Sequence, residues 1–331
     1  MPMLSLPSVL SAAILALFLA SGTARGQTAD PIVIGLDADF TGATASGGEA
    51  IRIGASAAIE EINAAGGIRG RPLRLVVTNH RANPRRGVHN FRELVSRHGA
   101  VAVLTGVQSP VAIAQLEPAH TLGIPIISPW AAATTFIDNG HAPNYAFRVS
   151  IRDAHAGGYL VGEAMRRGYR RFGFLMQNTP WGISNQRALS DAVEATGLAE
   201  IGAQVWFAWG QDHLRDEVDE LLRAEVEAIF LIASPKGGQG LVAALSALPI
   251  SERPVVFSHW GVVGSDFFDV TQGQAAEIQM KILQTYSFFA PTDPDRLKRL
   301  FEVICKPYRI CGASDVKAPT GLARAKRCVA S

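Results

Sequence analysis

The eight histidines are the side chains best suited to acid–base or metal chemistry, but their spacing does not bring them together. His80, His89 and His98 are nine residues apart, which does not align them on one face of a helix. The sequence lacks the H-E-x-x-H pattern of zinc hydrolases and the G-x-S-x-G pattern of serine nucleophiles, and no glycine-rich phosphate cradle opens the first helix. We therefore expect no enzyme, no cofactor and no metal site.

A serine followed by a proline is the clearest candidate for binding a ligand without reacting with it. Ser109 comes shortly after an expected strand at 101–104 and directly before Pro110, a residue type favoured in the first turn of a helix. We therefore expect Ser109 to cap a helix N-terminus, where free N–H groups attract an anion. The alternative is a structural cap whose hydroxyl serves only its own helix.

Strands and helices alternate in two series along the chain, and these elements must position any site. Short apolar runs predict strands buried on both faces, and apolar residues at helical spacing predict the helices between them. The expected strands are 32–36, 73–78, 101–104, 124–127, 172–176, 204–207, 228–232 and 254–257, and the expected helices are 51–62, 88–98, 110–121, 154–167, 183–195, 214–223 and 240–248. Because the pattern restarts after residue 148, we expect an α/β fold of two lobes with parallel sheets and a ligand pocket between them.

The length and charge of the chain limit its class and its partners. A chain of 331 residues predicts two domains, and 48% hydrophobic with 18% charged residues is typical of a globular protein. The formal net charge of +2 lacks the basic excess of proteins that bind nucleic acid or membrane surfaces. We therefore expect a small-molecule ligand.

The first 26 residues resemble a signal peptide. An apolar stretch at 9–20 is too short to span a bilayer, and Ala24-Arg25-Gly26 places small residues where signal peptidase reads. We expect cleavage before Gln27 and export to the periplasm. The n-region has no Lys or Arg, and the alternative is an uncleaved anchor helix.

All three cysteines lie near the C-terminus. The main body of the chain therefore has no thiol that could act as a catalytic nucleophile. In an oxidising compartment, Cys305 and Cys311 are candidates for a disulfide across a short loop, which leaves Cys328 without a partner.

Several motifs in a fixed order resemble type I periplasmic binding proteins, in particular the leucine/isoleucine/valine-binding-like receptors of ABC importers. These motifs include N-A-A-G-G-I at 63–68 and I-P-I-I-S-P at 124–129. The others are I-G-L at 34–36, F-T-G at 40–42, Gly106 with Ser109, F-R at 147–148 and A-P-T-G at 318–321. The resemblance implies two Rossmann-like lobes that close on a small ligand without chemistry.

The resemblance also implies a domain arrangement and a partner. Lobe 1 is expected to comprise 27–148 and 259–331, and lobe 2 to comprise 149–258. The receptor is expected to be a monomer that hands its ligand to an ABC permease in the inner membrane. A periplasmic ligand sensor of the same fold is the alternative within this class.

In the resembling receptors, the serine that matches Ser109 binds the ligand carboxylate, and the loop after Pro129 presents N–H groups and a threonine hydroxyl. The N–H groups here would be those around Ala131, and Ala132 stands at the threonine position. The hydroxyl must therefore come from Thr134 or be absent.

Trp181 and Asp153 match further positions of the family, whereas Trp130 stands where the family commonly has a small residue. Trp181 aligns with a ring that lies over the ligand, and Trp130 could form a wall of the cleft or pack beneath a helix. Asp153 lies at the crossover between the lobes, where it is either a hinge or helix-start residue or a ligand contact.

One departure from the family bears on the ligand. Amino-acid receptors place a carboxylate after the strand that matches 254–257, but this chain has Ser258-His259-Trp260 there. A buried ammonium without a partner is costly, so this site should disfavour α-amino acids. With Trp260 near the cleft, we expect a small organic acid or amide with an apolar or aromatic body, and an amino-acid-like ligand is the alternative. One or two of the three tryptophans could instead be core residues.

The C-terminus also departs from the family. The resembling proteins continue past the A-P-T-G motif with a further helix and strand, whereas residues 324–331 form a short basic tail. The chain looks C-terminally truncated, which would expose apolar surface. A non-functional truncation product is therefore a further alternative to a receptor.

Overall fold

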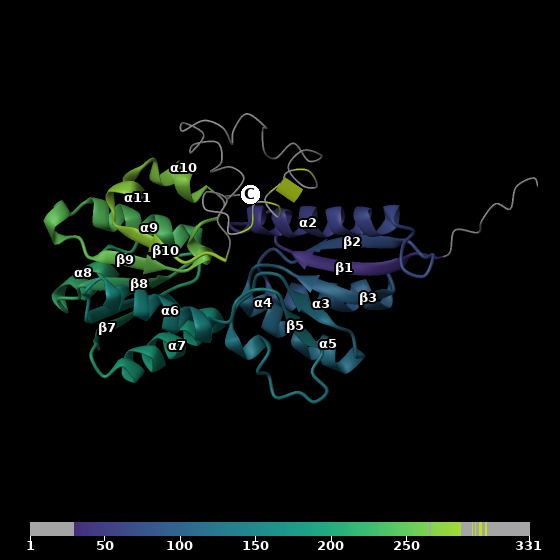
Figure 1. Ribbon diagram of the computed structural model, residues 1–331, viewed down its shortest axis with the longest axis horizontal. Helices are drawn as coiled ribbons and strands as arrows, with labels where there is room; N and C mark the ends of the chain where they lie inside the picture. The colour runs from purple at the N-terminus through teal and green to yellow at the C-terminus, as the bar shows by residue number, and fades with distance from the viewer. Residues whose placement is uncertain are drawn as a thin grey trace, which may run out of the picture.

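The protein consists of two parallel five-stranded sheets, each flanked by helices, as the computed structural model shows (Figure 1). The structure describes residues 30–264 and 266–285, together with residues 293, 295, 298, 299 and 302. The strand orders are β2-β1-β3-β4-β5 in the first lobe and β10-β9-β8-β6-β7 in the second. The expected α/β class with two parallel-sheet lobes is confirmed. The expected signal peptide, the cysteines and the basic tail lie outside the described residues.

The first lobe contains the elements up to residue 148. Helix α2 covers one face of its sheet, and α3, α4 and α5 lie on the other (Figure 1). Its elements are β1 (Ile32–Ala38), α2 (Ala45–Ala64), β2 (Leu73–Asn79), α3 (Pro84–Ser96), β3 (Ala100–Thr105), α4 (Ser109–Ala114), α5 (Leu116–Leu122), β4 (Ile126–Ser128), η1 (Thr134–Phe136) and β5 (Ala146–Arg148).

The second lobe begins at α6 and repeats the same architecture. Helices α6 and α7 cover one face of its sheet, and α8 to α11 cover the other (Figure 1). Its elements are α6 (Asp153–Arg166), β6 (Arg171–Gln177), α7 (Pro180–Thr196), β7 (Glu200–Phe207), α8 (Arg215–Arg223), β8 (Ala228–Ile232), α9 (Pro235–Ser246), η2 (Ile250–Glu252), β9 (Val255–Ser258), η3 (Trp260–Val262), α10 (Phe267–Thr271), α11 (Gln274–Glu277) and β10 (Met280–Ile282).

The central strands follow directly from their apolar runs. Every residue of β8, with the sequence AIFLI, is buried, as expected for a strand covered on both faces. Phe230 on this strand packs edge-on against Phe172 and Phe174 of β6. These contacts make the second sheet a rigid base for the loops that follow its strands.

The expected single helix over 110–121 is instead two short helices, α4 and α5, separated at Gln115. Pro118 lies one turn after Ala114 and has no N–H to donate to its carbonyl, so the helical ladder is interrupted there.

The chain was expected to return to lobe 1 at residue 259. This expectation is wrong, because the segment that follows stays in the second lobe. β10 pairs in parallel with β9 and extends the second sheet. Val262, Phe267 and Ile278 are buried in the second lobe's core, because they cover apolar surface on the face of that sheet. The second lobe therefore continues to at least Ile282.

No helix among the described residues is long and apolar enough to cross a membrane.

Candidate functional site

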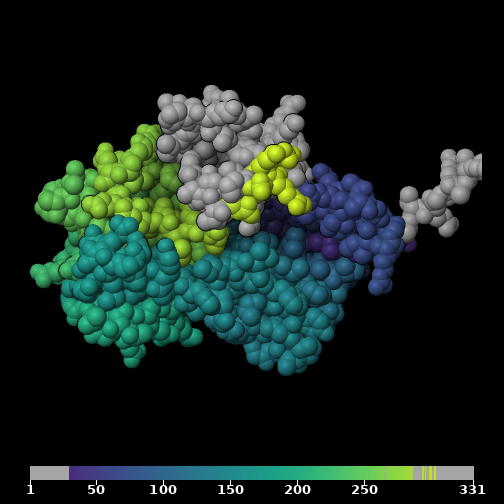
Figure 2. All heavy atoms as spheres, viewed as in Figure 1, coloured from purple at the N-terminus to yellow at the C-terminus, as the bar shows by residue number. Residues whose placement is uncertain are grey.

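An open cleft lies where the loops of the two lobes face each other. Most of its lining residues directly follow the carboxyl ends of parallel strands, which is where ligands bind in such sheets. Figure 2 shows the two lobes packed side by side across the molecule. The lining residues are Thr44, Val107, Gln108, Ser109, Pro110, Trp130 and Ala132 from the first lobe, and Gln177, Thr179, Trp181, Trp209, Ser234, Trp260 and Gly261 from the second.

Five of the residues expected at the site from the sequence line this cleft. They are Ser109, Trp130, Ala132, Trp181 and Trp260. The cleft therefore brings together residues from both halves of the chain.

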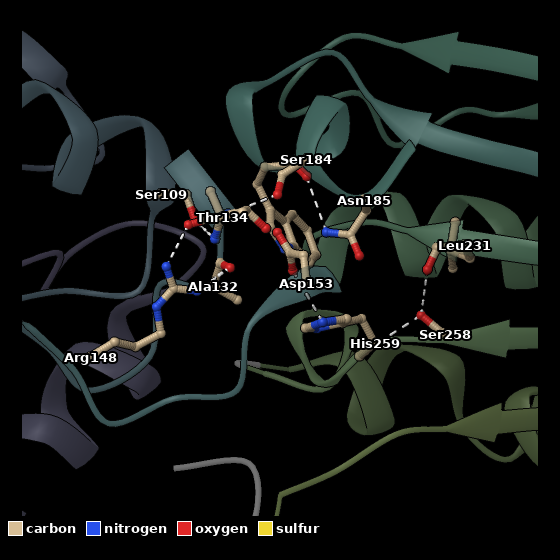
Figure 3. A network of polar contacts seen from close by, with 12 residues as sticks. Ser109, Ala132, Thr134, Arg148, Asp153, Ser184, Asn185, Leu231, Ser258 and His259 are labelled. Atoms are coloured by element: carbon tan, nitrogen blue, oxygen red, sulfur yellow. Dashed lines mark hydrogen bonds and ion pairs between the residues drawn. The ribbon is translucent and has the colours of Figure 1, made fainter. Parts of the chain in front are cut away.

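Two other expected contacts lie outside the lining. Ala131 is buried, and its carbonyl accepts a hydrogen bond from Ser128 Oγ at 3.1 Å. The Thr134 N–H donates to Ser184 Oγ of α7 at 2.8 Å, so Thr134 links the two lobes through its backbone (Figure 3). The expectation that Thr134 supplies a hydroxyl to the ligand has no support in this geometry.

Ser109 lines the cleft but does not cap a helix. Gln108 is the N-cap of α4, and Ser109 is its first residue. The Ser109 hydroxyl accepts a hydrogen bond from the Ala133 N–H at 3.3 Å, and α4 has only six residues. The predicted cap is therefore wrong by one position, because the extended residue before the helix is Gln108. The Ser109 hydroxyl binds the adjacent loop and keeps its own proton to donate.

The loop that contains Ala132 is held in place from behind by an arginine. The Arg148 guanidinium at the end of β5 donates to the carbonyl oxygens of Ala132 and Ala133, the latter at 2.7 Å (Figure 3). Burial lowers the pKa of Arg148, although nearby Asp153 opposes the shift. Arg148 thus fixes the loop backbone beside Ser109 without lining the cleft.

Asp153 is fully buried beneath the aromatic wall of the cleft. Its Oδ1 accepts a hydrogen bond from Trp181 Nε1 at 3.3 Å and lies 3.5 Å from His259 Nε2 (Figure 3). Its own N–H donates to the Ala132 carbonyl at 3.3 Å, at the start of α6. Asp153 therefore orients Trp181 at the crossover between the lobes and is absent from the lining.

His259 completes this aromatic wall. Its ring lies against Trp260 at a tilt of 40°, with a centroid separation of 3.4 Å, and meets Trp181 edge-on at 5.4 Å. Burial lowers the pKa of His259, although Asp153 opposes the shift. The imidazole is therefore neutral and acts as a packing element between the two indoles.

The polar groups that line the cleft are all neutral. None of the lining residues in the described part of the chain is charged. Hydrogen bonding therefore falls to hydroxyls and to two glutamines, one in each lobe: Gln108 and Gln177. Gln177 Nε2 donates to Ser234 Oγ at 2.9 Å, and Gln177 Oε1 accepts from the Ser234 N–H at 3.0 Å.

Nine of the fourteen lining residues were not expected from the sequence, among them Gln108, Gln177, Trp209 and Ser234. Each of these four lies at or within three residues of the carboxyl end of a strand. That position is a usable signal, since ligands bind at this edge of a parallel sheet. No group of three or more metal-ligating side chains occurs among the residues the structure describes.

The family follows from comparison with known proteins. The sequence profile of the family described as periplasmic binding protein matches residues 31–301. The chain therefore belongs to this family, and its two parallel-sheet lobes have the type I fold.

Individual relatives agree with this fold. An amino acid binding protein from Pseudomonas aeruginosa is 36% identical over 154 residues, which cover 45% of this chain and 40% of that protein. A type 1 periplasmic binding protein from Bordetella pertussis superimposes with a TM-score of 0.77 at 21% identity, covering 86% of this chain and 76% of the other. A Rhodopseudomonas palustris solute-binding protein in complex with 4-hydroxybenzoate gives a TM-score of 0.74 at 17% identity, covering 91% and 77%. The match to the curated relative thus spans about two fifths of its length.

Proposed function

We propose that this protein is the extracytoplasmic solute receptor of an ABC importer, with its ligand held in the cleft between the lobes. The ligand is a small organic acid or amide with an apolar or aromatic body, and it needs no ammonium group. The observation that carries this proposal is a cleft with four tryptophans, neutral polar groups and no charged residue in its described lining. The partner is an inner-membrane ABC permease, and the receptor works as a periplasmic monomer.

The absence of a lining acid argues against α-amino acids. An ammonium buried without a carboxylate partner loses hydration that neutral oxygens do not fully replace. Asp153, the acid beneath the cleft wall, is fully buried and is bonded to Trp181. It therefore lies behind the lining and is not exposed to a ligand.

The aromatic lining supports a flat apolar ligand body. Trp130 comes from the first lobe, while Trp181, Trp209 and Trp260 come from the second, so a ring between them is covered from both sides. Burying such a ring contributes about 1.5–3 kcal/mol. The 4-hydroxybenzoate bound to the Rhodopseudomonas palustris protein belongs to the same ligand class.

A thermal-shift screen of the purified protein tests this proposal. The probes are leucine, phenylalanine, benzoate, 4-hydroxybenzoate and benzamide. We expect at least one aromatic ligand without an amino group to raise the melting temperature more than either amino acid. If leucine gives the largest shift and the other ligands give none, the proposed ligand class is wrong.

A further inference from the structure

Trp209 differs from the other three cleft tryptophans in how little of its ring the protein covers. Trp260 is buried, and Trp130 and Trp181 are half-buried. These three rings share one apolar cluster, formed by both lobes around Ala132. Trp209 is instead 39% exposed. Much of its indole is therefore open to the cleft or to solvent.

The other rings are also engaged by contacts that Trp209 lacks. Trp181 Nε1 donates to Asp153, and both Trp181 and Trp260 lie against the His259 ring. Among the residues that the structure describes, Trp209 makes no aromatic ring contact, and its indole N–H has no hydrogen-bond partner. Trp209 therefore keeps more free ring surface than the other three, together with a free donor.

Hydrogen bonds hold the turn that carries Trp209 in place. The Gln211 N–H donates to the Ala208 carbonyl at 3.1 Å, and Gln211 Oε1 accepts the Ala208 N–H at 3.0 Å. Gly210 has a φ of +90°, a conformation that favours glycine. Gln211 Nε2 also donates to Glu217 Oε1 of α8 at 2.6 Å. The backbone of Trp209 is thus anchored to the second lobe, while its side chain remains uncovered.

An uncovered indole at the edge of a cleft favours a flat ligand. Trp209 follows β7 by two residues and lines the cleft. A ligand ring that lies against it removes apolar surface of both rings from water, and two flat rings stack favourably when offset. A puckered saturated ring brings fewer of its atoms into contact with a flat face, so it gains less from dispersion.

We propose that Trp209 determines specificity in the cleft by stacking on the ligand, and that it selects a flat aromatic body over a saturated ring of the same size. This inference rests on the proposed function, since it assigns the side chain that recognises the body of the ligand at the same site. Trp209 acts by contact with the ligand, and the turn at 208–211 positions it.

Trp206 provides a matched control in the same segment. It lies on β7 outside the cleft lining, three residues before Trp209, and is 38% exposed. A single exposed apolar side chain is normal on a protein surface and needs no ligand to explain it. Any general effect of removing an exposed indole should therefore be the same at both positions.

Calorimetric titration with two pairs of probes tests the proposal. The pairs are benzoate with cyclohexanecarboxylate and benzamide with cyclohexanecarboxamide, which share a polar group within each pair and differ in the flatness of the ring. For the wild type, we expect the aromatic member of at least one pair to bind at least tenfold more tightly than its saturated partner. In Trp209→Ala, its affinity should fall at least tenfold and this preference should shrink to within about threefold. Trp206→Ala should leave all affinities within about twofold.

Two further variants separate stacking from bulk. Trp209→Phe keeps a flat ring and should retain most of the preference for the aromatic probe. Trp209→Leu keeps apolar bulk without a flat face, so it should lose the preference while both members of the pair still bind. Melting temperatures without ligand establish that each variant is folded.

The outcomes separate this inference from the proposed function. If an aromatic probe binds the wild type and binds Trp209→Ala equally well, Trp209 does not recognise the ligand, but an aromatic-ligand receptor remains. Equal binding of flat and saturated probes to the wild type, or an unchanged preference in Trp209→Leu, would also overturn the role of Trp209 alone. If none of the four probes binds, the proposed ligand class and this inference both fail.

Discussion

At the scale of single residues, Ser109 shows how one hydroxyl serves both the fold and the cleft. It receives the Ala133 N–H, which fixes the loop after β4, and it lines the cleft in which we propose that the ligand binds. The Ser109 oxygen stabilises the fold by accepting the Ala133 N–H, whereas its proton is available for a ligand. Substitution of Ser109 should therefore affect both stability and binding.

We expect Ser109→Ala to weaken binding of an aromatic amide by about tenfold or more, as the loss of one hydrogen bond of ~1.5 kcal/mol predicts. The same change leaves the Ala133 N–H buried without a partner and should lower the unfolding free energy by ~1–3 kcal/mol. Calorimetric titration and urea unfolding measure the two effects. Ser109→Thr keeps the hydroxyl and should retain more of the affinity, whereas an unchanged affinity in Ser109→Ala would exclude a ligand contact.

His80 is a second residue whose surroundings have a measurable consequence. It is fully buried, and its Nδ1 accepts the Ala82 N–H at 3.0 Å. Burial lowers the pKa of His80 from 6.5 to about 4, although Asp39 opposes the shift. Between these two values the unfolded chain binds a proton that the folded protein does not, so stability falls as the pH falls from about 6.5 to 4.

We expect His80→Asn, which keeps an acceptor near the place of Nδ1 but does not titrate, to lose less stability than wild type between pH 7.5 and pH 4.5. The difference should approach ~3 kcal/mol in urea unfolding. Asp37 has the opposite effect on the pH dependence of stability. Burial raises its pKa from 3.8 to about 7, so its contribution to stability rises as the pH falls through this range. Its contribution is common to both proteins and cancels in the comparison. Parallel pH dependences would show that His80 titrates normally.

At the scale of elements, the close crossing of α6 and α7 supports the second-lobe side of the cleft. Helix α7 begins just before Trp181, and α6 begins with Asp153, so their separation sets the distance between these two side chains. Gly157 allows the approach, since a Cβ there would lie 2.7 Å from the backbone carbonyl of Ala188. The neighbouring Gly158 has no atom within 4 Å of the same position.

We expect Gly157→Ala to lower the unfolding free energy by ~1–3 kcal/mol, because backbone atoms of α7 must move to admit the methyl group. Gly158→Ala is the matched control on the same helix and should raise it by up to ~1 kcal/mol through helix propensity. Denaturant unfolding of both variants checks this pair. Equal effects of the two substitutions would mean that α6 and α7 are not in close contact.

At the scale of the whole molecule, the tryptophans report on the cleft between the lobes. Four of the five tryptophans line it, and the fifth, Trp206, lies on β7 outside the lining. The Thr134 N–H to Ser184 Oγ hydrogen bond joins the lobes at the same place. Ligand binding should therefore change the surroundings of most indoles at once.

We expect an aromatic ligand to change the intrinsic tryptophan fluorescence and, at 100 times its Kd, to stabilise the fold by ~2.7 kcal/mol. Trp206→Phe should retain the ligand-dependent change, whereas Trp181→Phe should reduce it. A signal that disappears with Trp206 alone would place the ligand elsewhere.

The sequence by itself determined most of the elements of this protein and their class. Apolar periodicity is a local property, so the alternating strands and helices were predictable, and the expected strand 228–232 coincides with β8. The cleft tryptophans Trp130, Trp181 and Trp260 were also accessible, because loops after parallel strands converge at one edge of the sheet.

Only the tertiary structure decided how these groups are used. The extension of the second sheet by β10, the burial of Asp153 under Trp181 and the link between Thr134 and Ser184 all depend on residues far apart in the chain. Thr134 and Ser184 are 50 positions apart, and their hydrogen bond joins the two lobes. Residue spacing in the sequence does not predict such contacts, because hydrogen-bond direction and burial depend on the partners that folding brings together.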